Sequence, residues 1–164
     1  MSYEPTIYAK ENNVLYRKLR LSLENKSWES VFWSESTSSV PDDTGVISNG
    51  LVYAWKRDYI SEELITTLLK KNNDSEIQNM LNDGVLATCE IFIDENYSIN
   101  DEYEDDEIEE LVEDMGENYV AQLRQAKCTI TSRSNNGCGP LTDEFHEIFL
   151  DILIKMTNGF YEEE

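Results

Sequence analysis

Leu-Val-Tyr-Ala-Trp, residues 51–55, is a short apolar and aromatic run of the kind that forms a buried β-strand. Residues 31–33, Val-Phe-Trp, have the same character. The polar stretch 34–49 separates the two runs, and Ser48-Asn49-Gly50 supplies a turn just before the second one. The pattern therefore predicts two antiparallel strands joined as a hairpin.

Further strands are expected on both sides of this pair. Residues 15–23 carry leucines that largely alternate with polar residues, which indicates a third strand with one buried face. Residues 85–93 and 127–132 are also rich in β-branched and apolar side chains. We predict an α+β domain in which an antiparallel sheet from the N-terminal part packs against three or four helices, one of them strongly acidic.

Helices are expected mainly in the second part of the chain. Ser61 has N-cap chemistry and is followed by two glutamates and an apolar face, and a short second helix is expected to end near Gly84. Thr142 is the predicted N-cap of the last helix, and Gly159 is its predicted C′ residue. The buried face of this last helix is predicted to consist of Phe145, Ile148, Phe149, Ile152, Leu153 and Met156.

Residues 101–117, DEYEDDEIEELVEDMGE, contain eleven carboxylates in seventeen positions and no Lys or Arg. A run of like charge is often a disordered tail, but this one lies inside the chain and has apolar residues at helical spacing. Ile108, Leu111 and Met115 are predicted to be protected from solvent on one side of a helix. Gly116 weakens the prediction that the helix continues unbroken toward Leu123.

The acidic side chains of this segment recur every three or four residues, which places neighbours about 5–6 Å apart on the solvent side of a helix. Such a row is broadly comparable with the phosphates along a nucleic-acid strand. Ordinary solvation of an acidic protein is the plain alternative. The candidate partner-binding residues are Glu102, Asp105, Asp106, Glu109, Glu110, Glu113, Asp114, Glu117 and Tyr103.

The charge is unevenly distributed along the chain. Residues 1–60 hold 8 acidic and 7 basic side chains, whereas residues 61–164 hold 26 acidic and 6 basic ones, so that nearly all of the net charge of −21 lies in the second part. Such a field attracts basic protein surfaces and repels nucleic acid and anionic lipid. We expect a basic protein partner, namely a nucleic-acid-binding enzyme or a toxin, and no direct binding to nucleic acid or membrane.

The length of 164 residues fits a single domain, residues 1–164, that can bury a substantial core. The start of the chain lacks a signal-peptide pattern, and no apolar run is long enough to span a membrane. The three cysteines show no CxxC spacing, and the chain has one histidine, so neither a disulfide framework nor a zinc site is predicted. We expect a cytoplasmic protein without a cofactor.

Carboxylates also suit hard cations, and residues 94–105 partly match the ligand spacing of a calcium-binding loop. Ile99 occupies the place where an EF-hand loop needs glycine, and the preceding residues read as a strand instead of a helix, so no metal site is predicted. The positions that would match the loop ligands are Asp94, Asn96, Ser98, Asn100, Glu102 and Asp105.

Enzymatic activity is not predicted. Cys138, between two glycines and ahead of a helix, is the best candidate nucleophile, and His146 is close to it in sequence. However, His146 falls beside Phe145 on the predicted helix, away from the thiol, and the chain has no GxSxG, HExxH, P-loop or dinucleotide motif. A surface histidine and an unreactive turn cysteine are the expected roles.

Three classes of function remain. The first is an inhibitor from a phage or mobile element that blocks a defence enzyme by placing carboxylates where phosphates would bind, as a DNA mimic. The second is an immunity or antidote protein that neutralises a cationic toxin, for which Tyr97, Tyr103 and Tyr119 are candidate apolar anchors among the acids. The third is a phage structural or assembly protein.

Overall fold

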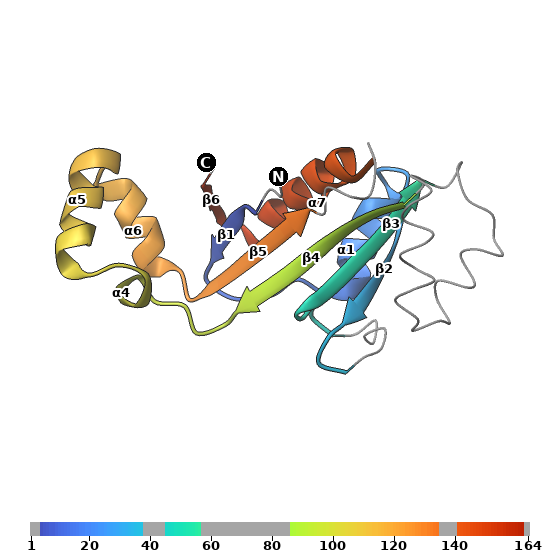
Figure 1. The fold of residues 1–164 in the computed structure, drawn as a ribbon, viewed down its shortest axis with the longest axis horizontal. Helices are drawn as coiled ribbons and strands as arrows, with labels where there is room; N and C mark the ends of the chain where they lie inside the picture. Colours follow the sequence, from blue (N-terminus) through green and yellow to red (C-terminus); the bar gives the residue numbers. More distant parts are fainter. Residues whose placement is uncertain (1–3, 38–44, 57–85, 135–140, 163–164) are drawn as a thin grey trace.

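The computed structural model describes residues 4–37, 45–56, 86–134 and 141–162 (Figure 1). Its framework is a six-stranded, fully antiparallel sheet in the order β2-β3-β4-β5-β1-β6. The strands are β1 (Thr6–Ala9), β2 (Trp28–Ser34), β3 (Gly50–Lys56), β4 (Leu86–Asp94), β5 (Cys128–Ser134) and β6 (Phe160–Glu162). The predicted α+β class with an antiparallel sheet is confirmed.

Two helices, α1 (Tyr16–Glu24) and α7 (Leu141–Thr157), cover one face of this sheet (Figure 1). Alternate residues of each strand point toward them, for example Phe32 on β2, Val52 on β3 and Ile130 on β5. On α7, Phe145 and Phe149 stack with ring centroids 5.5 Å apart, and both are fully buried. The main core therefore lies between the sheet and these two helices.

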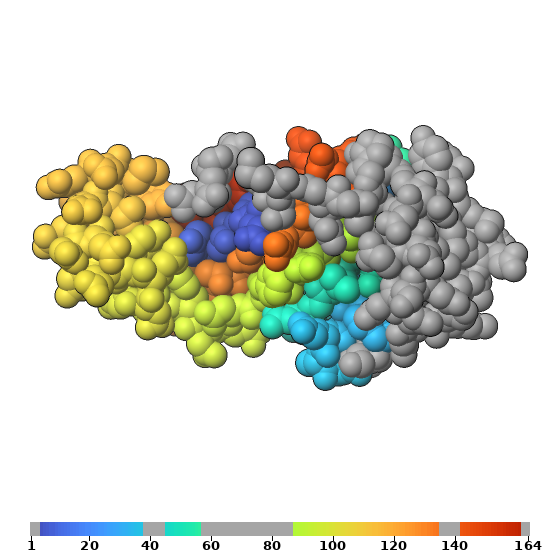
Figure 2. All heavy atoms as spheres, in the orientation of Figure 1, coloured from blue at the N-terminus to red at the C-terminus, as the bar shows by residue number. Residues whose placement is uncertain are grey.

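Three further helices, α4 (Ile99–Glu102), α5 (Asp105–Met115) and α6 (Glu117–Gln125), lie together beyond the ends of β4 and β5 (Figure 1). We call residues 95–127 the acidic module, because they hold 12 acidic and 2 basic side chains. The rest of the described chain is called the body. The module projects from the end of the sheet instead of lying on either face, which leaves its helices open to solvent on their outer side (Figure 2).

Four predicted strands appear in the structure, as β2, β3, β4 and β5. The strand predicted over residues 15–23 is wrong, because these residues form helix α1. Leu15, Leu19 and Leu23 are spaced by four residues, as a helix face requires, whereas Leu21, which produced the alternating pattern, is 45% exposed. Strands β1 and β6 were not predicted, and both are only three or four residues long.

The ends of α7 differ from the prediction by one or two residues. The helix already begins at Leu141, so Thr142 lies in its first turn, where it is buried, and is not the N-cap. At the other end, the left-handed conformation that was predicted for Gly159 is found one residue earlier, at Asn158 (φ 52°). The predicted helices at 61–71 and 77–84, Cys138 and the turn at 135–137 lie outside the described residues.

A candidate acidic interface

The acidic module is fastened to the body through its two ends and through a shared apolar cluster. The backbone N–H of Lys127 donates to the carbonyl of Ala9 at 2.9 Å, and the N–H of Tyr97 donates to the carbonyl of Lys127 at 3.0 Å. These bonds tie the entry and exit of the module to each other and to β1. The carboxylates of the module are therefore held at a fixed place relative to the sheet.

The module has an apolar core of its own, separate from the main core. Ile99 of α4, Ile108 of α5 and Val120 and Leu123 of α6 are all at most 5% exposed. Tyr8 of β1 completes this cluster from the body side, with its ring 5.3 Å from that of Tyr97. Because these buried residues come from every helix of the module, the module is a folded unit and not an acidic tail.

Local chemistry explains where α5 begins. The side chain of Glu107 accepts a hydrogen bond from the backbone N–H of Glu104 at 3.1 Å, which satisfies a donor just ahead of the helix. Asp105, Asp106 and Glu107 occupy the first turn, where negative charge meets the positive end of the helix dipole. These acidic residues thus stabilise the start of the helix on which the other acidic residues of the segment lie.

Gly116 ends α5 and begins α6. Its backbone has φ 95° and ψ 162°, a region that residues with a Cβ almost never occupy, and its N–H donates to the carbonyl of Val112 at 3.0 Å. A Cβ at this position would meet no atom within 4 Å, so the requirement for glycine is conformational and not a matter of space. The interruption suggested by the sequence is therefore a sharp change of direction between two helices.

Every acidic residue among the predicted partner-binding residues is exposed. In the part of the chain that the structure describes, no Lys or Arg forms an ion pair with the carboxylates of α5; the ion pairs found there join Lys56 to Glu144, Arg133 to Glu4 and Lys155 to Asp151. The structure thus brings these acids together on one projecting unit without basic residues between them. Their side chains are open to a cationic partner.

Glu102 differs from the other acids because the body contacts it. Its Oε1 accepts a hydrogen bond from the hydroxyl of Tyr8 at 3.2 Å. Burial, and then the neighbouring Glu102 carboxylate, raise the pKa of Tyr97 above its usual range. Glu102 therefore helps to fix the module on the body in addition to contributing charge.

The aromatic residues of the module contribute mainly to its interior. Tyr97, Tyr103 and Tyr119 are each half-buried and pack against the module core, and the ring of Tyr119 lies 5.2 Å from that of Phe160 on β6. Their availability as partner anchors is correspondingly reduced.

Met115 was predicted to be protected from solvent, but its side chain is 52% exposed. It lies in the last turn of α5, just before the chain changes direction at Gly116.

The segment weighed as a calcium loop folds differently from an EF-hand. Ile99 is 5% exposed in the module core, and α4 begins there, in the middle of the would-be loop. Asp94 instead accepts a hydrogen bond from the N–H of Asn96 at 2.9 Å, which forms a local turn. Within the described residues, no three His, Cys, Asp or Glu side chains are arranged to hold a metal ion.

His146 is not the surface residue that we predicted; it is 2% exposed. Its Nε2 lies 2.9 Å from the hydroxyl of Ser132, which is itself fully buried on β5. Burial lowers the pKa of His146 to about 4, although Asp143 acts in the opposite direction. The imidazole is therefore neutral at physiological pH, with one side facing the core.

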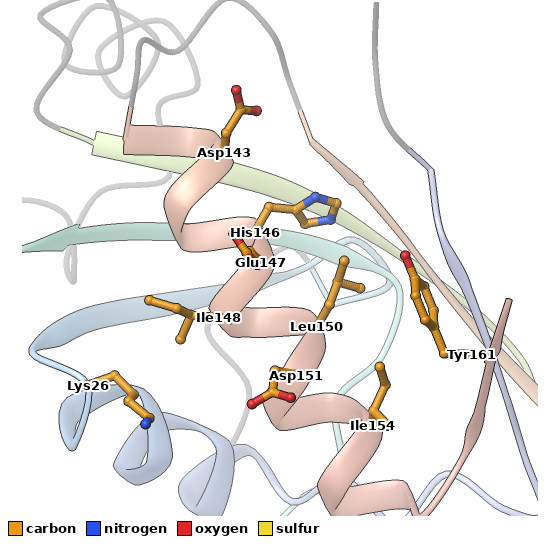
Figure 3. A pocket seen from close by; sticks show the side chains of 9 residues that line it. All are labelled: Lys26, Asp143, His146, Glu147, Ile148, Leu150, Asp151, Ile154 and Tyr161. Atoms are coloured by element: carbon orange, nitrogen blue, oxygen red, sulfur yellow. The ribbon is translucent and has the colours of Figure 1, made fainter. Parts of the chain in front are cut away.

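A groove of about 740 Å³ runs along the outer side of α7 past His146 (Figure 3). Its lining includes the apolar side chains of Leu150 and Ile154, the ring of Tyr161, and the charged side chains of Lys26, Asp143 and Asp151. No Ser, Thr or Cys side chain of the described residues lines this groove, and Ser132, whose hydroxyl contacts His146, is fully buried. Of the cysteines, Cys89 and Cys128 are buried, and burial raises the pKa of Cys128 to about 11, which keeps its thiol protonated.

Comparison of the chain with protein-family models, with curated proteins and with solved structures gives no match. No helix in the described part of the chain is long and apolar enough to cross a membrane.

Proposed function

We propose that the protein is a non-enzymatic inhibitor that binds a basic, nucleic-acid-handling protein and presents the carboxylates of its acidic module where the partner would bind phosphates. A phage or mobile-element protein that blocks a defence enzyme fits this description. The observation that carries the proposal is the exposure of all the acids of α5 on a projecting unit whose helices pack on an apolar cluster shared with β1 and β6. A rigid row of charge can match fixed cationic sites, which a flexible tail cannot do without losing conformational entropy.

A like-charged row is unfavourable for the helix that carries it, by a few tenths of a kcal/mol for each pair. A helix with no other role would be more stable with lysine interspersed. The alternative of a toxin antidote needs aromatic anchors among the acids, and the three tyrosines considered for that role pack against the module core. Within the module, this arrangement favours recognition through the carboxylates.

The test compares two triple variants with the same change in net charge. The module variant carries Asp106→Lys, Glu110→Lys and Glu113→Lys on exposed positions of α5. The body variant carries Glu11→Lys, Glu24→Lys and Glu147→Lys, which lie outside the module. A partner recovered from host lysate at low ionic strength is then used in competition between each variant and a nucleic acid.

We expect the module variant to lose more than about tenfold in affinity for the partner and to stop competing with nucleic acid, while the body variant changes little. The affinity of the wild-type protein should also fall as salt screens the exposed charges. If the two variants lost the same affinity for the partner, binding would depend on the net charge of the protein and not on the position of the carboxylates. Unchanged affinity in both would show that the module is not the binding surface.

A further inference from the structure

The face of the sheet opposite α1 and α7 is exposed around Phe92, near the end of β4 that leads into the acidic module (Figure 2), whereas Tyr53, Trp55 and Thr88 on the same face are buried. Phe92 of β4 points outward on this face and is 44% exposed. It lies opposite Thr131 in the neighbouring strand, and Thr131 is joined to Thr6 of β1 by a 3.0 Å hydrogen bond between their hydroxyls. A large, exposed apolar side chain thus lies beside hydroxyl side chains on this face.

The neighbours of Phe92 along its own strand are acidic. Glu90 and Asp94 are two residues away on either side and therefore point to the same face, each about 7 Å along the strand from Phe92. Asp94 is also the last residue before the module begins. The acidic surface of the module therefore continues onto the sheet around Phe92. Arg133 of β5 is paired with Glu90 in register on this face, and its charge is taken up by an ion pair with Glu4 at 2.9 Å.

Partly exposed apolar residues extend this surface toward β2. Trp33 and Leu51 are paired across β2 and β3, and Leu51 is paired with Glu90 on β4. Both Trp33 and Leu51 are only half-buried, on the same face as Phe92. An exposed aromatic residue with apolar neighbours and a polar rim is the usual composition of a protein-binding surface.

We propose that Phe92 is the specificity-determining contact of the inhibitor: a partner held by the acidic module also inserts an apolar side chain, flanked by Lys or Arg, against Phe92 between Glu90 and Asp94. Charge complementarity selects this occupant, because an apolar segment without basic residues would leave these two carboxylates facing an apolar surface. Carboxylates alone attract every cationic groove, whereas the apolar contact discriminates among them. The proposal rests on the function proposed above.

The test uses two arginine-rich peptides of equal length and charge, one with Trp and the other with Ser at its centre. Wild-type protein should bind the Trp peptide about tenfold more tightly than the Ser peptide. Phe92→Ala should abolish this ratio, and Phe92→Leu should keep most of it. Leu21→Ala is the matched control, because Leu21 is equally exposed at 45% but lies on α1, across the sheet.

The module variant Asp106→Lys, Glu110→Lys and Glu113→Lys separates this proposal from the function on which it rests. It should weaken the binding of both peptides while the ratio between them persists, because Phe92 is unchanged. Unaltered binding of both peptides to this variant would contradict the proposed function. If wild-type protein bound the Trp and Ser peptides equally well, the role of Phe92 would be overturned. The same holds if Phe92→Ala and Leu21→Ala reduced the preference for the Trp peptide equally.

Discussion

Buried His146 makes the stability of the fold depend on pH in a way that can be calculated. Its pKa is about 4 in the folded protein, against 6.5 for an exposed histidine. Between these two values the unfolded chain binds a proton that the folded chain does not bind. The free energy of unfolding should therefore fall as the pH is lowered from 6.5 toward 4 and should be unaffected by His146 above that window.

The expected size of the effect is about 1.4 kcal/mol for each pH unit, or about 3 kcal/mol over the whole window. The chain has 34 carboxylates that also titrate at low pH, so the wild-type profile alone does not isolate the histidine. His146→Gln removes the titration and retains an amide that can bond to Ser132. The difference between the two profiles then belongs to His146.

The measurement is urea unfolding at a series of pH values from 7.5 to 4 for both proteins. A direct check comes from NMR, because the chain has a single histidine whose ring signal can be followed without assignment. Asp143→Asn should lower the pKa of His146 further, since Asp143 favours the charged form. Parallel stability profiles for wild type and His146→Gln, or a ring that titrates near 6.5, would refute this explanation.

Other predictions concern the acidic module and are tested by urea unfolding and amide exchange of residues 105–125. Gly116→Ala should cost about 1–3 kcal/mol because the backbone there suits only glycine, and no loss would contradict the positive φ. Ile108→Ala should cost about 2–4 kcal/mol, whereas Met115→Ala should stay within about 0.5 kcal/mol, since only Ile108 is buried. Tyr8→Phe should cost about 1 kcal/mol by removing the hydrogen bond to Glu102, and an unchanged module would show that this bond does not fasten it.

The sheet was predictable where its strands are long and apolar. Residues 51–55 and 31–33 lie in paired strands, because a continuous apolar run of that length fits a strand buried by neighbours. Strand β1 has four residues and β6 has three, which is too few for a periodic signal, and both are defined by pairing with strands distant in sequence. Helix α1 was missed because one exposed residue, Leu21, produced an apparent alternation.

The acidic helix was predictable because its apolar residues keep helical spacing through the charged run. What the sequence did not indicate is how the module is fastened. Tyr8 and Phe160 come from strands far away in the chain, and nothing in their local sequence marks them as neighbours of Tyr97 and Tyr119. Phe92 could not be identified either, since the alternation of β4 does not tell which face of the sheet α1 and α7 cover.

The structure explains how the protein maintains a helix with so much charge of one sign. Like-charged pairs along α5 oppose it by roughly 2 kcal/mol in total, on the order of a few tenths for each pair. Burial of Ile108 and Leu123 in the module core contributes more than this, at about 2 kcal/mol for each side chain. The module therefore folds with its repulsion unrelieved, and a cationic partner that neutralises the row removes that repulsion on binding. Folding and binding of the module are thus linked: whatever binds the carboxylates also stabilises the helix that presents them.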